Sequence, residues 1–170
     1  MLKLKCSLIS AAIAIVGAAT VTRHLAASSY TQYMYAGDEL NGGAGDTLTS
    51  SQGGYKLKMV FTLTGYFGEA AWYMAWIEVA NNGLLWNSLS DGNGGDRFGD
   101  HIAQWSLCTN GSDNPSALMQ DDGNFVMYDS NDVSCWATQT NPNSGAWLGA
   151  QDDSNLVVYT GEGAPLWALF

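Results

Sequence analysis

An all-β fold of short strands is predicted by the composition and by a duplicated segment. The 170-residue chain has 20 glycines, seven tryptophans and eight tyrosines, which favours strands joined by tight turns over long helices. Two stretches repeat the same order of polar and apolar residues, and a tryptophan follows each at the same distance. A structural unit has therefore been duplicated, within one domain of about 140 residues.

The repeated stretch has the pattern Gln-x-Asp-x-Asn-x-Val-x-Tyr, and Trp136 and Trp167 follow the two copies eight residues after the tyrosine. On a straight strand the polar groups would spread over roughly 26 Å, which is much longer than one sugar. The Asp-rich centre of each copy favours a turn, so we expect a hairpin that brings Gln and Tyr together. The pattern falls on Gln120, Asp122, Asn124, Val126 and Tyr128, and again on Gln151, Asp153, Asn155, Val157 and Tyr159.

Each hairpin would present an acceptor-only carboxylate, two amides, a phenol and an apolar valine in a shallow patch. Such a set suits a ring that carries several hydroxyls and one C–H face. A phosphate ligand would need cations, and none is near either copy in the sequence. The residues therefore predict two sites for an uncharged sugar, and the alternative is a pair of polar hairpins without a ligand.

The pattern resembles the signature of the bulb-type (monocot) mannose-binding lectins, and both copies match it without a substitution. The resemblance covers roughly residues 37–170 and implies a β-prism II fold, in which three antiparallel sheets surround a pseudo-threefold axis. It implies that Trp86, Trp136 and Trp167 meet in the centre. It also implies that Asp and Asn bind the axial 2-hydroxyl of mannose, Gln the 3-hydroxyl and Tyr the 4-hydroxyl, while Val packs on ring carbons.

The first unit of such a prism has no intact motif. Counting back from Trp86 places the five site positions on Ala70, Trp72, Met74, Trp76 and Glu78, and none of them matches. We expect this unit to keep the fold without the sugar site. Its Trp-rich strand is either part of the sheet core or an exposed aromatic platform.

The N-terminus is typical of an export signal. Lys3 and Lys5 precede an uncharged run that reaches Thr22, and small residues follow it. We expect residues 1–27 to be a signal peptide, which predicts a secreted or extracellular protein; a retained anchor is the alternative, and only then would a membrane be a partner. Residues 28–170 form the expected lectin domain, with a degenerate first unit at about 37–88, an insertion at about 89–110, a second unit at about 111–141 and a third at about 142–170.

Cys108 and Cys135 remain beyond the signal, and a pair of cysteines in an exported protein is expected to form a disulfide. The positions of these two cysteines are not those of the disulfide that the family uses.

Asn110 begins an N-glycosylation sequence. The insertion resembles one turn of a calcium-binding repeat between Asp91 and Asp100, but a lone copy cannot form the shared cage, so we expect a loop there and no metal or other cofactor.

The charge limits the partners. Removing residues 1–27 leaves three Lys or Arg against 16 Asp or Glu, a net charge of 3 − 16 = −13, which repels nucleic acid and anionic lipid.

The chain has two histidines and no nucleophile motif, and neighbouring Asp residues on a strand would face opposite ways, so we do not expect an enzyme. The prediction is a secreted lectin for mannose-containing glycans, with homo-oligomers through the C-terminal strand implied by the resemblance; the alternative is a surface coat or filament subunit with vestigial sugar sites.

Overall fold

The computed structural model describes residues 28–62, 71–88 and 115–170. The predicted signal at 1–27 and the predicted insertion at 89–110, with Cys108 and Asn110, lie outside these residues. The described part is built of strands: β1 (Ser29–Thr31), β2 (Tyr33–Met34), β3 (Glu39–Asn41), β4 (Thr47–Thr49), β5 (Tyr55–Thr62), β6 (Ala71–Glu78), β7 (Gly83–Asn87), β8 (Ser116–Met119), β9 (Phe125–Tyr128), β10 (Ser134–Ala137), β11 (Trp147–Ala150), β12 (Leu156–Tyr159) and β13 (Pro165–Ala168).

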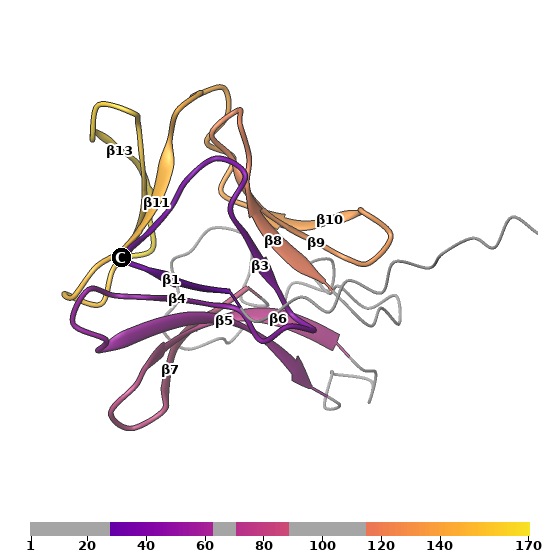
Figure 1. The fold of residues 1–170 in the computed structure, drawn as a ribbon, viewed down its shortest axis with the longest axis vertical. Coiled ribbons are helices and arrows are strands. Elements are labelled where there is room, and N and C mark those ends of the chain that lie inside the picture. The colour runs from indigo at the N-terminus through magenta and orange to yellow at the C-terminus, as the bar shows by residue number, and fades with distance from the viewer. Residues whose placement is uncertain (1–27, 63–70, 89–114) are drawn as a thin grey trace, which may run out of the picture.

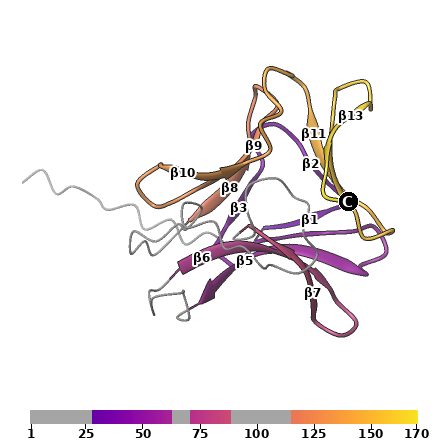
Figure 2. The same cartoon turned by 180° about the vertical axis from the view of Figure 1, so that it is seen from behind.

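The strands form three sheets around a common interior, as Figure 1 shows and Figure 2 confirms from behind. The first sheet has the order β1-β4-β5-β6-β7, the second β10-β9-β8-β3 and the third β13-β12-β11-β2. Each sheet contains three strands that follow one another in the chain and pair antiparallel. The predicted β-prism II architecture is therefore confirmed.

The N-terminal segment joins the three sheets. Strand β2 pairs with β11, β3 pairs with β8 and β4 pairs with β5, so residues 33–49 supply one further strand to every sheet. Strands β2 and β3 are edge strands, whereas β4 lies between β1 and β5. The first sheet therefore does not coincide with the first unit predicted at about 37–88, because β3 falls within that range but lies in the second sheet. The β1–β4 pair is parallel, and it departs from the prediction that all pairs would be antiparallel.

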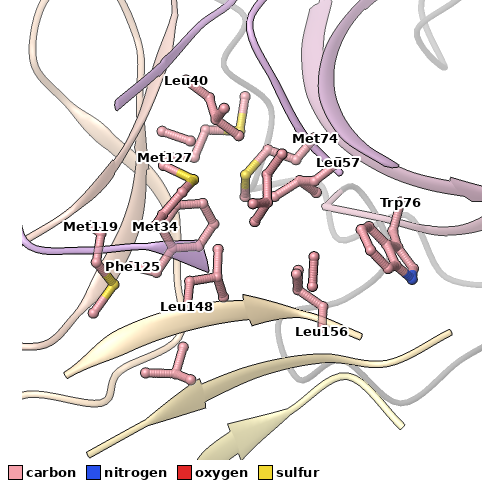
Figure 3. Packing of buried hydrophobic residues seen from close by; sticks show 14 of the residues in the cluster. Met34, Leu40, Leu57, Met74, Trp76, Met119, Phe125, Met127, Leu148 and Leu156 are labelled. Carbon is pink, nitrogen blue, oxygen red and sulfur yellow. The ribbon is translucent and has the colours of Figure 1, made fainter. Parts of the chain in front are cut away.

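Alternating side chains of the three sheets turn inward and build one core, part of which Figure 3 shows. The motif strands β9 and β12 contribute four side chains that are at most 1% exposed: Phe125, Met127, Leu156 and Val158. Other buried members include Met34, Leu40, Leu57, Met74, Met119 and Leu148. Burying the apolar faces of three sheets against one another is what holds them together.

The three predicted tryptophans meet inside the prism. The ring of Trp136 lies edge-on to Trp86 at 5.3 Å and to Trp167 at 5.7 Å between centroids. Trp86 and Trp136 are buried and Trp167 is half-buried. Aromatic rings prefer this tilted contact because the edge of one ring is positive and the face of the other negative.

The Trp-rich strand β6 belongs to the core and is not an exposed platform. Trp76 is fully buried, and its Nε1 donates to the carbonyl of Ser154 at 2.8 Å. Trp72 is half-buried against the core and contacts Phe61 at 5.2 Å. Trp76 also fastens the first sheet to the turn of the third, a contact that sequence reasoning did not indicate.

Candidate carbohydrate-binding site

Both copies of the motif fold back as hairpins, as predicted. The first turn lies between β8 and β9, where Gln120 N donates to Asn124 O at 2.9 Å; in the third sheet Gln151 N donates to Asn155 O at the same distance. The residue at the bend has a positive φ in each copy, +88° at Gly123 and +76° at Ser154. Turns of this kind favour Gly, and Ser accepts the conformation at some cost.

The Gln and Tyr side chains of each copy meet on the outer face of the hairpin. Gln120 Nε2 donates to Tyr128 Oη at 2.5 Å, and Gln151 Nε2 donates to Tyr159 Oη at 2.6 Å. Tyr128 is paired across the ladder with Ser116 and not with Gln120, so the contact depends on two long side chains that extend toward each other along the strand. The predicted proximity is confirmed, and its cause is side-chain reach as well as the turn.

The valine of each copy lies on the same outer face, between the Asn and Tyr positions of the motif. Strand alternation places Asn124, Val126 and Tyr128 on one face. Val126 and Val157 are each only 3% exposed, yet neither belongs to the core cluster. Their low exposure means that a sugar ring can contact the valine only if neighbouring side chains of this face move.

The second Asp of each copy is exposed at the turn. Asp122 Oδ1 accepts from Asn124 N at 3.0 Å, and Asp153 Oδ1 accepts from Asn155 N at 3.1 Å. This bond from a side chain to the backbone two residues on is the usual way in which Asp stabilises a turn. It fixes the direction of the carboxylate while the group stays open to solvent.

Two threonines orient the asparagine of the first copy. Thr138 Oγ1 donates to Asn124 Oδ1 at 3.1 Å, and Thr140 N donates to the same oxygen at 3.3 Å. Thr140 Oγ1 also donates to Gly123 O at 2.6 Å. Because these donors use the oxygen of Asn124, its Nδ2 is directed to donate outward.

The asparagine of the second copy is held differently. Asn155 Oδ1 accepts from Phe170 N at 3.1 Å and from Leu156 N at 2.9 Å, while its Nδ2 donates to Phe170 O at 3.1 Å. Leu169 occupies the place of Thr138, because Leu169 N donates to Leu156 O as Thr138 N donates to Phe125 O. A ligand at this hairpin must compete with the Phe170 backbone for the amide, so the two hairpins are not equivalent.

The first Asp of the second copy has a structural role. Asp152 accepts hydrogen bonds from Ser51 Oγ and, at 2.9 Å, from Gln52 N in the turn between β4 and β5. The bond from Ser51, followed by that from Gln52, holds the pKa of Asp152 below its ordinary value. The adjacent acids Asp152 and Asp153 therefore serve different partners.

The first sheet has no motif on its outer face, but the residues at the site positions differ from those predicted. Ser88 N donates to Met74 O and Ser88 Oγ accepts from Met74 N, as Thr138 does with Phe125. Met74 is therefore the counterpart of the core residue Phe125, and the outer positions are Tyr73, Ala75 and Ile77. Counting from Trp86 was wrong by one residue because Ile77 pairs with Leu84 seven positions on, whereas Tyr128 pairs with Ser134 six positions on.

Two other predictions fall beyond the described residues in whole or in part. Cys135 is half-buried on β10, but Cys108 lies outside the described part, so the disulfide stays a prediction. The same holds for the loop expected without a metal between Asp91 and Asp100. Within residues 28–62, 71–88 and 115–170, no group of three His, Cys, Asp or Glu side chains could hold a metal ion.

Comparison with known proteins identifies the fold. Neither a family model nor a curated protein sequence matches the chain. Among solved structures, a lectin from Marasmius oreades shares 22% identity over 84% of this chain and 93% of its own, with a TM-score of 0.55. A monomeric monocot mannose-binding lectin from Gastrodia elata shares 25% identity over 81% of this chain and 94% of its own, with a TM-score of 0.52. The chain thus has the fold of the bulb-type lectins, as the resemblance of its motifs implied.

Proposed function

We propose that the protein is a secreted lectin that binds mannose or mannose-rich glycans through the hairpins of the second and third sheets. The observation that supports the proposal is the repeated outer face, on which a bonded Gln–Tyr pair and a valine are present in each copy while Asp and Asn lie at the turn. Directional donors and acceptors around a small apolar centre suit a neutral polyol. The similarity to the mannose-binding lectin from Gastrodia elata supports the same assignment.

The arrangement suggests how each side chain would act in the first hairpin. The Asp122 carboxylate would accept from the axial 2-hydroxyl, and the Nδ2 of Asn124, directed outward by Thr138, would donate to the same oxygen. Gln120 and Tyr128 would exchange their mutual bond for bonds to the 3- and 4-hydroxyls. This exchange would also uncover Val126 for the ring carbons. The Gln–Tyr bond would be replaced by bonds of similar strength to the sugar, and the contact between Val126 and the ring would be an additional favourable term.

Secretion is part of the proposal and depends on residues 1–27, as does the alternative of a retained anchor. No helix within the described ranges has the length and apolar character needed to cross a membrane. Secretion can be checked by expressing the full chain and sequencing the N-terminus of the exported product. Cleavage near Ala27 would support a signal peptide, and an uncleaved membrane-associated chain would support the anchor.

A comparison of two epimers tests sugar recognition. Methyl α-mannoside and methyl α-glucoside differ only at the 2-hydroxyl, which Asp and Asn are proposed to bind. We expect the mannoside to displace the protein from a mannan surface at a concentration about tenfold or more below the glucoside, since a lost charge-assisted hydrogen bond is worth about 1.5–3 kcal/mol. Equal displacement would refute recognition of the axial hydroxyl, and no binding to mannan would favour the coat or filament alternative.

A further inference from the structure

The outer face of the first sheet is cationic in an otherwise acidic protein. Leu57 and Met59 point into the core, so alternation turns Lys56 and Lys58 outward on β5. These are the two Lys or Arg residues in the described ranges, where Asp and Glu are far more numerous. We call this surface the lysine face, and its described members are Ser29, Thr31, Thr47, Thr49, Lys56, Lys58, Val60, Tyr73, Ala75, Ile77, Leu84 and Asn87.

The described residues of this surface carry no carboxylate. In the five described strands of the first sheet the acidic residue is Glu78, which alternates with the outward Ile77 and bonds to Asn81 Nδ2 at 2.7 Å. Asp46 precedes β4, but it is buried and accepts from the backbone of Ser28 and Asn41. The cross-strand neighbours of Lys56 are Thr49 and Ile77, and those of Lys58 are Thr47 and Ala75, so no described neighbour across the strands neutralises either ammonium group.

The lysine face occupies the place that the sugar sites occupy in the other sheets. Leu118 lies opposite Val126 in the second sheet, and Gly149 lies opposite Val157 in the third. At the same step of the first sheet, Lys58 lies opposite Ala75. A cation beside a small residue has thus replaced the neutral apolar centre of the site.

The neighbours of the two lysines suit a ligand with hydroxyls as well as charge. Thr47 lies opposite Lys58 and Thr49 opposite Lys56 on one side, and Asn87 lies opposite Ala75 on the other. Ala75 and Ile77 are 1% and 5% exposed although neither belongs to the core cluster, as expected if the lysine stems cover them. Lys56 and Lys58 are two residues apart, about 6.6 Å along the strand, so their ammonium groups can converge on one anionic group.

We propose that the lysine face binds a saccharide that carries a carboxylate or sulfate group. The two ammonium groups hold the anion, and the hydroxyls of Thr47 and Thr49 bind the ring hydroxyls. The net negative charge of the protein opposes an anionic ligand only weakly at physiological salt, because exposed charges farther than about 8 Å are largely screened. The proposal does not depend on mannose binding by the two hairpins.

Binding of defined tetrasaccharides to the full chain tests this proposal. The probes are tetragalacturonate for the carboxylate, a sulfated chondroitin tetrasaccharide for the sulfate and maltotetraose as the neutral control, each at 50 and 300 mM NaCl. We expect at least one anionic probe to bind, to weaken at the higher salt, and to bind more tightly than maltotetraose. Absence of binding by both anionic probes, or equal binding of maltotetraose, would overturn the proposal.

Variants identify the surface. Lys56→Gln combined with Lys58→Gln keeps the stems and should lower the affinity for the anionic probe about tenfold or more, while Lys56→Arg with Lys58→Arg should retain it. Asp122→Asn with Asp153→Asn should leave it unchanged, so the lysine face and the hairpins are tested separately. Failure of the wild type to bind mannose would count only against the hairpins. Unchanged affinity in a folded Gln variant, or equally tight binding of a tetraglutamate peptide, would contradict the saccharide assignment.

Discussion

At the scale of single residues, Gly123 controls the first hairpin. Its φ is +88°, and a Cβ built there would lie 2.1 Å from the carbonyl oxygen of Asn143. That segment is close because Asn143 N donates to Asp122 O at 2.7 Å. The pattern of the motif predicts a turn, but a close approach of backbone from outside the hairpin could not be read from it.

We therefore expect Gly123→Ala to destabilise the protein more than Gly163→Ala. Both glycines have φ +88°, but nothing lies within 4 Å of a Cβ at Gly163. The extra cost at Gly123 should be about 1–3 kcal/mol, as for forced overpacking, and denaturant titration of both variants measures it. Equal stability of the two would show that Asn143 can move away at no cost.

The two asparagines mark what could and could not be predicted at this scale. Their positions follow from the repeat, and their side chains do lie at the hairpin turns. The partners of Asn155 are backbone atoms of Phe170, and no local spacing identifies them. For that reason the sequence predicts two equal sites. In the structure they differ, because the Asn155 amide is bonded to the Phe170 backbone, whereas only the oxygen of the Asn124 amide is bonded to Thr138 and Thr140.

At the scale of strands and turns, Thr138 connects the first site to the sheet. Its hydroxyl accepts from Phe125 N at 3.1 Å, donates to Asn124 Oδ1 and contacts Thr140 Oγ1 at 2.8 Å. Thr138→Val should leave buried groups unsatisfied and cost about 1–3 kcal/mol. We expect it to weaken sugar binding at the first hairpin while the second, which has Leu169 at this place, keeps its affinity; equal weakening at both would contradict the assignment.

Counting residues failed for the first sheet because one extra residue lies in the β6–β7 connection. In a strand a shift of one residue exchanges the two faces, so Trp72, Met74 and Trp76 were assigned to the outer face and in fact point inward. The fold itself was predictable, since the tryptophans and the two hairpins repeat. The pairing of β2 with the third sheet and of β3 with the second could not be predicted, because strands of two or three residues are too short to show an alternation of polar and apolar residues.

At the scale of the whole molecule, Trp136 is the central packing residue, in contact with Trp86, Trp167 and Phe125. Trp136→Ala should lower the free energy of unfolding by about 3–5 kcal/mol, as expected for a large core truncation. Trp167→Ala should cost less because Trp167 is only half-buried. A change below about 1 kcal/mol for Trp136→Ala in a denaturant titration would show that the ring is not central.

Asp152 links the third sheet to the first and makes this link sensitive to acid. Its pKa is lowered by the bonds from Ser51 and Gln52, so the link stabilises the fold above the unfolded value of about 3.9 and is lost as the pH falls through the lower folded value. Asp152→Asn should remove part of the stability difference between pH 5 and pH 2 in denaturant titrations. Asp121→Asn, at the equivalent exposed position, should keep the contribution of Asp152, and identical pH profiles of wild type and Asp152→Asn would exclude the link.

The central claim is that two hairpins of one chain are separate mannose sites, and isothermal titration with methyl α-mannoside tests it most directly. We expect a stoichiometry of two with affinities in the millimolar range, about −4 kcal/mol per site, the first hairpin binding more tightly than the second. Asp122→Asn and Asp153→Asn should each leave one site, and the double variant none, with thermal stability nearly unchanged. A double variant that binds like wild type, or a wild-type stoichiometry below two, would contradict the account.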